Sequence, residues 1–296
     1  MALNTDFTGF DGTDPGLRPV TPPLSSVWAT RRARALELVS EAPEAEEILS
    51  TYADLVDVQA RVAEQVPVRR WLALVSAEGG PPKLRLDRLP VDELVPLFAE
   101  FLAGTAQLGH DVLRTDAGAL SGTPGANWLV LFGTALASDA SDDDGPFHMR
   151  AFLQPVATAL AAADGGVVET AKGGRCLVCG AAPVVGSLEG PSERACRRSL
   201  ICAVCGTAWR LPRPACARCG EDDATKLVMR AASSLPWVHI DVCESCDGYV
   251  KVVDQRQRPD AVPIVEDLAT FELDLWAREQ GLVRVQENLF ASRASS

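Results

Sequence analysis

The stretch "RSLICAVCGTAWRLPRPACARCG" (residues 198–220) contains two Cys-x-x-Cys pairs that are separated by ten residues. Two more pairs flank it, in "CLVCG" (residues 176–180) and in "CESCDG" (residues 243–248). Two cysteines at this spacing can reach one ion from a tight turn, and a tetrahedral thiolate site needs four such ligands. The four pairs therefore predict two complete four-cysteine metal sites.

A small residue follows each pair. Gly180, Gly206 and Gly220 follow the first three pairs, and Asp247 with Gly248 follows the fourth. A small residue at this place lets backbone N–H groups turn toward the sulfur atoms. This repeated motif, which we call a knuckle, strengthens the metal-site prediction.

The spacing favours pairing of the knuckles in sequence order. Twenty-two residues lie between Cys179 and Cys202, and twenty-three lie between Cys219 and Cys243, which gives two similar ribbons. A crossed pairing, first with third and second with fourth, stays open. Ribbons of about 30 residues bury too little apolar surface to fold alone, so we expect structural metals. The predicted ligands are Cys176, Cys179, Cys202, Cys205, Cys216, Cys219, Cys243 and Cys246.

Catalysis by these metals is not expected. A hydrolytic zinc keeps an open position and usually has His or carboxylate ligands, whereas all eight knuckle cysteines are used in closed sets. His110 and His148 lie in the amino-terminal half, and His239 is expected in a strand or supporting role near the fourth knuckle. We predict no catalytic residues and no enzyme. Closed four-cysteine sites hold either zinc or iron, so the metal stays open.

The composition of the chain indicates what kind of protein carries these metal sites and where it is located. The chain has 296 residues, 47% of them hydrophobic, and all nine cysteines lie between residues 176 and 246, a pattern that favours metal binding over disulfides. The first thirty residues are polar and rich in Gly and Pro, unlike a secretion signal. The longest apolar run, residues 128–137, is shorter than the roughly 18 residues of a membrane span. We predict a cytoplasmic protein without membrane insertion.

The charge distribution argues against nucleic-acid binding. The net charge is −12, but residues 171–256 carry twelve Lys and Arg against nine Asp and Glu. Two thiolate-held divalent ions would bring this region to about −1. A nucleic-acid binder normally presents a basic surface.

Helical periodicity dominates the sequence before the cysteines. Apolar residues recur at helical spacing after Trp28, Pro43 is expected to separate two helices or to open the second, and further helices are expected at 91–109, 126–138 and 147–163. An acidic loop, "SDASDDDGP", lies between the last two.

After the last knuckle, Val250, Val252 and Val253 predict a strand. Residues 265–280 predict one amphipathic helix that ends near Gly281. Its expected inward residues are Leu268, Phe271, Leu275 and Trp276.

The predicted fold class is α+β: a helical domain, two small four-cysteine metal domains and a carboxy-terminal helix. The expected divisions are a flexible arm (1–27), the helical domain (28–170), the first metal domain (171–212), the second metal domain (213–256), and the final helix and tail (257–296).

These residues resemble one known family. The run C-x-x-C-G … L-x-C-x-x-C-x-x-x-W-x-x-x-R-x-x-C-x-x-C … C-x-x-C-x-x-Y-V-K is similar to that of the formate dehydrogenase accessory protein (FdhE) family. Further similarity lies in "VEDLATFELDLWAREQG" and in "YADLVDVQ" (residues 52–59). The matching residues besides the ligands are Gly180, Leu200, Trp209, Arg213, Tyr249, Lys251, Asp267, Leu268, Ala269, Leu273 and Asp274, and Val250 stands where the family has Leu.

The resemblance implies a helical domain followed by two rubredoxin-like metal domains, and iron is associated with the metal sites of the family. It also implies a cytoplasmic maturation factor that binds the catalytic subunit of formate dehydrogenase, and dimers are associated with the family. Departures from the family pattern include Ala208, Val250 and the additional Cys196.

Four of the matching residues are candidates for a partner-binding face, because Trp, Tyr and Arg often contribute most interface energy. They are Trp209, Arg213, Tyr249 and Lys251. The alternatives are that Trp209 packs against a knuckle and that Arg213 and Lys251 neutralise the metal sites. Two other functions stay open: a soluble rubredoxin-like electron carrier and, less favoured by charge, a zinc-ribbon nucleic-acid binder.

Overall fold

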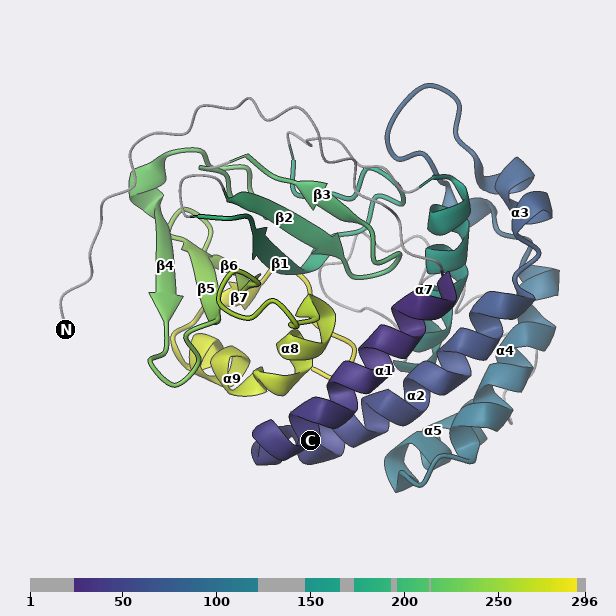
Figure 1. Cartoon of the computed structure of the whole chain (residues 1–296). Helices are drawn as coiled ribbons and strands as arrows, with labels where there is room; N and C mark the ends of the chain where they lie inside the picture. Colours follow the sequence, from purple (N-terminus) through teal and green to yellow (C-terminus); the bar gives the residue numbers. More distant parts are fainter. Residues whose placement is uncertain (1–23, 122–146, 166–172, 193–195, 213, 292–296) are drawn as a thin grey trace.

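The computed structural model describes residues 24–121, 147–165, 173–192, 196–212 and 214–291. Helices gather on one side of the molecule, and a mixed sheet with two helices beneath it forms the other side (Figure 1). The predicted α+β class and the order of its parts are confirmed. The expected helix at 126–138 and the acidic loop lie outside the described residues.

The helical half contains six described α-helices and two short 3-10 helices. They are α1 (Leu24–Glu41), η1 (Pro43–Ala45), α2 (Glu46–Gln65), α3 (Val68–Val75), η2 (Leu86–Arg88), α4 (Val91–Ala106), α5 (Asp111–Ser121) and α7 (Phe147–Ala163). Helix α1 begins inside the stretch 1–27 that was expected to be an arm. Pro43 does separate two helices, since it opens η1 between α1 and α2.

The core of this half follows from the apolar periodicity. Tyr52 and Val56 on α2 are buried, as the helical spacing predicts. Three aromatic rings join α4 to α7: the centroid of Phe152 lies 5.1 Å from that of Phe98 and 5.7 Å from that of Phe101. Burying each such side chain contributes about 1.5–3 kcal/mol. These aromatic contacts lie within the helical half.

Strands begin after the first knuckle. They are β1 (Pro183–Glu189), β2 (Arg197–Cys202), β3 (Ala208–Arg210), β4 (Leu227–Ala231), β5 (Val238–Cys243), β6 (Gly248–Asp254) and β7 (Val283–Arg284), with the 3-10 helix η3 (Ala224–Lys226) before β4. The expected strand around Val250 is β6.

The two metal ribbons share one sheet. Its strand order is β3-β2-β1-β6-β5-β4, and β7 pairs with β6. Within each ribbon the strands are antiparallel, but β1 of the first ribbon pairs in parallel with β6 of the second, with Gly186 opposite Val252. A residue larger than Gly at position 186 would crowd this pairing, because its Cβ would lie 3.1 Å from Val252 Cγ2.

Two helices follow β6 where one was predicted over residues 265–280. Helix α8 (Pro263–Ala269) and helix α9 (Phe271–Glu279) are broken at Thr270, whose φ and ψ are −111° and 37°. Gly281 lies just beyond α9 with a φ of 76°, as expected for a helix stop. Leu268 faces the core, but Leu275 and Trp276 are 41% and 39% exposed. The prediction that these two point inward is wrong.

Helix α8 connects the two halves of the molecule. It contacts α1 and α2 on one side and β1 and β6 on the other. A buried ion pair fixes this contact, with Arg34 Nε on α1 2.7 Å from Glu266 Oε1 on α8. Trp237 donates a hydrogen bond to the other oxygen of Glu266 at 3.2 Å. Within the described ranges, no helix is both long and apolar enough to cross a membrane.

Candidate metal centres

The first centre contains the first and second knuckles. The Sγ atoms of Cys176 and Cys205 lie 3.6 Å apart, and those of Cys179 and Cys202 lie 3.4 Å apart. Cys176 and Cys179 precede β1, whereas Cys202 ends β2, so the antiparallel β1–β2 pair brings the knuckles together.

The second centre contains the third and fourth knuckles. The Sγ atoms of Cys216 and Cys246 lie 3.8 Å apart, and those of Cys219 and Cys243 lie 3.7 Å apart. Strand β5 ends at Cys243, and β6 begins two residues after Cys246. The geometry thus confirms pairing in sequence order and contradicts the crossed alternative.

Both sets of thiols fit a tetrahedral metal ion. In each set the four sulfur atoms lie within 4.8 Å of one another. A tetrahedral ion with metal–sulfur distances of about 2.3 Å requires sulfur–sulfur distances of about 3.8 Å, close to those observed. The four thiols leave no position for a reacting water, which favours a structural or electron-transferring ion. Zinc and iron both suit this donor set.

The knuckle backbone supports the sulfur atoms. The amides of Val204 and Cys205 donate to Cys202 Sγ at 3.4 and 3.5 Å. In the third knuckle, the amides of Arg218 and Cys219 donate to Cys216 Sγ at 3.3 and 3.5 Å. Such N–H···S bonds offset the negative charge of bound thiolates, because the donors point at the sulfur.

In each set, the surroundings shift the pKa values of some of the thiols. Burial raises the pKa of Cys202, and hydrogen bonds from neighbouring thiols hold the pKa of Cys176 well below its usual range. In the second centre, burial raises the pKa of Cys246 to about 12, while the backbone N–H of Glu221 lowers the pKa of Cys219. A metal ion must therefore displace protons to bind, so its affinity falls as pH falls.

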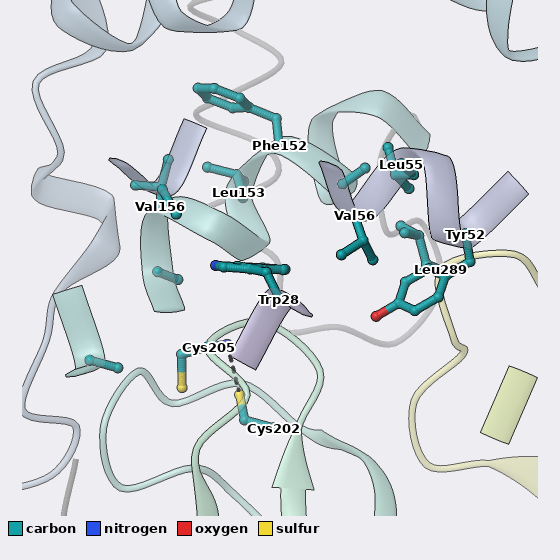
Figure 2. Close-up of a cluster of buried hydrophobic side chains, with 14 of the residues drawn as sticks. Trp28, Tyr52, Leu55, Val56, Phe152, Leu153, Val156, Cys202, Cys205 and Leu289 are labelled. Atoms are coloured by element: carbon teal, nitrogen blue, oxygen red, sulfur yellow. Dashed lines mark hydrogen bonds between the residues drawn. The ribbon is translucent and has the colours of Figure 1, made fainter. Parts of the chain in front are cut away.

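The two centres differ in their surroundings. Cys176, Cys202 and Cys205 belong to the main hydrophobic core together with residues of the helical half. Figure 2 shows Trp28 between the Cys202–Cys205 knuckle and the side chains of α7. In the second centre, by contrast, Cys219 is exposed and Cys246 is half-buried. The first centre is built into an interface, and the second lies near the surface.

Residues of the helical half, from a loop and from two helices, contact the first centre at three points. The amides of Lys83 and Leu84 donate to the carbonyls of Leu177 and Val178, at 3.0 and 2.7 Å. Gln154 on α7 donates to the carbonyl of Ala203, at 3.0 Å. Arg31 on α1 lies so close to Gly206 that a Cβ there would be 2.9 Å from Arg31 Nη2. The first knuckles are therefore held by the helical half as well as by the sheet.

The candidates for a partner-binding face are mostly buried. Trp209 and Tyr249 are each 1% exposed, and Lys251 is fully buried. In this conformation they cannot reach a partner, so their placement on an exposed face is contradicted. Trp209 packs into the core that contains Cys202 and Cys205, as the alternative interpretation expected. Arg213 lies outside the described residues.

Tyr249 and Lys251 instead belong to a buried charged network. Lys251 Nζ lies 2.7 Å from Asp274 Oδ2 and 3.0 Å from Asp267 Oδ1. Arg284 pairs with the same two carboxylates, 2.9 Å from Asp274. The Tyr249 hydroxyl donates to Asp274 at 2.8 Å. Burial raises the pKa of Asp274, but Lys251 and Arg284 lower it further, so that this pKa lies below its usual value and the carboxyl is ionised beside the two cations.

The network joins two of the segments that resemble the family: the Tyr-x-Lys motif and the sequence that follows it in α8 and α9. It ties β6, which follows the fourth knuckle, to α8, α9 and β7. Sequence reasoning missed Arg284 because no local pattern marks it. The opposite charges of Lys251, Asp267 and Asp274 were the available signal, but their pairing needs the fold.

His239 and Cys196, which the sequence also singled out, are not part of either cysteine set. His239 is buried in β5, with Nε2 3.3 Å from Asp241, and does not approach a cysteine set within hydrogen-bond distance. Its expected strand position is confirmed. Cys196 is a buried free thiol just before β2. None of the nine cysteines, all within the described ranges, forms a disulfide.

The fold and site together define a class: a helical protein half joined to one mixed sheet that carries two closed four-cysteine centres. Comparison with known proteins gives the family. Residues 215–291 match the family model "FdhE, C-terminal domain". A protein FdhE homolog of Aquifex aeolicus is 30% identical over 209 residues, which cover 71% of this chain and 74% of that protein. The chain belongs to the FdhE family.

Other relatives agree with this assignment. A protein FdhE homolog of Haemophilus influenzae is 35% identical over 117 residues, 39% of this chain and 37% of that relative. The crystal structure of the FdhE protein from Pseudomonas aeruginosa matches the fold with a TM-score of 0.72 at 22% identity, over 90% of this chain and 96% of that one. The fold similarity therefore extends over both halves.

Proposed function

We propose that this chain is a non-enzymatic accessory factor that binds the catalytic subunit of a formate dehydrogenase and assists its assembly or activation in the cytoplasm. Membership of the FdhE family is the observation that carries the proposal. The closed metal centres support it, because all eight thiols are used and no coordination position is left for substrate. Such centres suit the construction of a rigid binding surface.

The exposed side of α9 is the surface that we assign to the client. Leu275 and Trp276 are 41% and 39% exposed there, and Val283 of the adjoining β7 is 46% exposed. Exposed apolar patches often mark protein interaction sites, and Trp is a frequent source of interface energy. The buried network beneath holds α9 against β6 and β7, so this surface is pre-organised and costs little ordering on binding.

Co-purification tests the function. A tagged wild-type chain, loaded with metal, should capture a formate dehydrogenase catalytic subunit produced in the same cells. A Leu275→Ala, Trp276→Ala double variant should capture at least about tenfold less, since removal of an interface Trp often costs about 2 kcal/mol or more. Leu74→Ala on α3 is the matched control, because Leu74 is an apolar side chain with 46% exposure elsewhere.

The outcomes separate the function from the surface. If the wild-type chain failed to capture the catalytic subunit at full metal content, the proposed function would be wrong. If wild type and double variant captured it equally, only the assignment to α9 would be wrong. Size measurement of the free chain tests the associated expectation of a homodimer.

The exposure of Cys219 gives one observation in favour of the electron-carrier alternative. A ligand thiol at the surface would bring a redox partner close to the second centre. Metal analysis of the co-purified sample distinguishes the two functions. An electron carrier needs iron in its centre, whereas an accessory factor with zinc in both centres would still bind the client. If the protein loaded with zinc bound the client, a redox change of the metal would not be needed for client binding, because zinc does not change its oxidation state.

A further inference from the structure

A chain of hydrogen bonds runs from α2 through α7 to the Cys202–Cys205 knuckle of the first centre. Gln59 on α2 is fully buried, and its Nε2 donates to the carbonyl of Ala151 at 2.7 Å and to Gln154 Oε1 at 3.0 Å. Gln154 lies on α7, and its Nε2 donates to the carbonyl of Ala203 at 3.0 Å. Gln154 accepts on one side and donates on the other, so it connects α2 to the knuckle. We call this chain of bonds the glutamine relay.

The direction of the relay follows from the groups at its ends. The carbonyls of Ala151 and Ala203 can only accept hydrogen bonds, so the amide nitrogens of the two glutamines must face them. When Gln154 is turned in this way, its oxygen faces Gln59 and accepts from it. Both side-chain amides therefore donate toward the metal centre.

The relay ends on the peptide group that supports a metal ligand. Ala203 and Val204 share this peptide group: its carbonyl accepts from Gln154, and its N–H donates to Cys202 Sγ at 3.4 Å. A hydrogen bond to a carbonyl polarises the peptide and strengthens the bond that its N–H donates, by about 10–30% per bond. The two glutamines are thus placed to strengthen the N–H···S bond at Cys202.

Packing alone does not explain the amide of Gln59. Within the described residues, its Oε1 atom is buried without a hydrogen-bond partner. An unsatisfied buried acceptor costs about 1–3 kcal/mol, whereas an apolar side chain of the same shape would fill the space without this cost. The amide at position 59 is therefore better explained by the hydrogen bond that it donates to Gln154.

The second centre offers an internal comparison. In its third knuckle, the amide of Arg218 donates to Cys216 Sγ at 3.3 Å. The carbonyl of the same peptide group belongs to Ala217 and lies against Gly174, where an added Cβ would come within 1.7 Å of the carbonyl oxygen. Glycine has no side chain that could donate a hydrogen bond. The glutamine relay therefore distinguishes the first centre from the second.

We propose that Gln154 is a positioning residue of the first metal centre and that Gln59 acts through it. By strengthening the N–H···S bond, the two side chains stabilise the negative charge of the bound Cys202 thiolate. They thereby raise the affinity of this centre for zinc or iron, since substitution of such outer partners typically lowers metal affinity 10–100-fold. The relay is independent of the proposed client surface on α9.

NMR spectroscopy of the zinc-loaded full chain tests the proposal, because the amide protons of Val204 and Arg218 report on the two centres separately. Gln154→Met keeps the length of the side chain but removes the donor. In this variant we expect the Val204 amide proton to move upfield, since its hydrogen bond to sulfur is weaker. The first centre should also bind zinc about tenfold more weakly in competition with a chelator, while the Arg218 proton and the second centre do not change. Gln59→Met should give a smaller change in the same direction.

Gln65→Met is the matched control, because Gln65 is an exposed residue at the end of α2 and lies outside the relay. It should leave both amide protons and both zinc affinities unchanged. The proposal is overturned if Gln154→Met leaves the Val204 proton and the affinity of the first centre at their wild-type values. It is also overturned if this variant weakens both centres equally, because that result indicates a general loss of stability.

The two glutamines are tested separately by their own variants. An effect of Gln154→Met together with wild-type behaviour of Gln59→Met would overturn the role of Gln59 alone. None of these measurements involves the client, so failure of this proposal leaves the co-purification result, and hence the proposed function, unaffected.

Discussion

At the scale of single residues, the position after each cysteine pair explains the knuckle motif. The φ angles of Gly180, Gly206, Gly220 and Asp247 are 81°, 67°, 79° and 54°, all in the left-handed region. Gly adopts this region without steric cost, and Asp is among the few other residues that tolerate it. These positions could be predicted from sequence because the turn geometry is local.

Two of these glycines should differ in their tolerance of Ala. Gly220→Ala should cost about 1 kcal/mol from backbone strain alone, since its Cβ would meet open space. Gly206→Ala should cost more, because its Cβ would also lie 2.9 Å from Arg31 and would displace that buried side chain. Thermal unfolding of the metal-loaded variants measures both. Equal losses would contradict the close packing of Arg31 on the knuckle.

The buried position of Lys251 could not be predicted from the sequence around it. A Lys beside a knuckle suggests a surface cation, but its partners Asp267 and Asp274 lie 16 and 23 residues further along the chain, and Arg284, which shares these partners, lies 33 residues further along. No periodicity or spacing brings these groups together before the fold is known. Burial of two cations with two carboxylates depends on tertiary structure.

Removing the Lys251 charge should therefore destabilise the fold. Lys251→Met leaves Asp267 and Asp274 with one cation, and breaking a buried pair typically costs about 3–5 kcal/mol. Lys226→Met is the control, because Lys226 pairs with Glu221 at the surface and such pairs contribute about 0–1 kcal/mol. Similar thermal stabilities for the two variants would refute a structural role for the network.

At the scale of elements, the two metal ribbons could be predicted from the sequence, but their joining into one sheet could not. The cysteine spacing indicates two antiparallel units, whereas the parallel β1–β6 pairing joins residues more than 60 positions apart. The break between α8 and α9 was also missed, since the apolar pattern runs through Thr270. Leu275 and Trp276 lie on the apolar face of the single helix that the sequence predicts. Because the helix breaks at Thr270, α9 has a different orientation, and both side chains are exposed.

Loss of the second centre should damage the sheet more than the helices. With Cys216→Ser and Cys219→Ser, we expect the β4–β6 region to unfold while the helical half keeps most of its structure, because none of the four cysteines of the second centre belongs to the main core that contains the helices. Circular dichroism at 222 nm should retain most of its helical signal. Complete loss of that signal would show that the halves fold as one unit.

Metal release should proceed in two phases. A colorimetric chelator should remove the ion of the second centre first, because Cys219 is exposed while the first centre lies in the core. Lower pH should accelerate release, since protons compete for the thiolates and burial raises the pKa of metal-free Cys246 to about 12. A Cys176→Ser, Cys179→Ser variant should retain only the fast phase. A single phase in wild type would contradict the difference between the centres.

At the scale of the whole molecule, the helical half and the first centre share one hydrophobic core. The order of the parts could be predicted from the sequence, because each half has its own pattern: helical periodicity before residue 165 and knuckles after residue 175. The contact between them could not, since Arg34 and Glu266 are 232 residues apart. The division into separate helical and metal domains at the stated boundaries stays a prediction.

The central claim is that this chain carries two closed four-cysteine metal centres. X-ray absorption spectroscopy with metal quantification on the purified full chain tests it most directly. The account predicts about two ions per chain, each with four sulfur neighbours at about 2.3 Å and no oxygen or nitrogen ligand. One ion per chain, or a light-atom ligand at either centre, would contradict it.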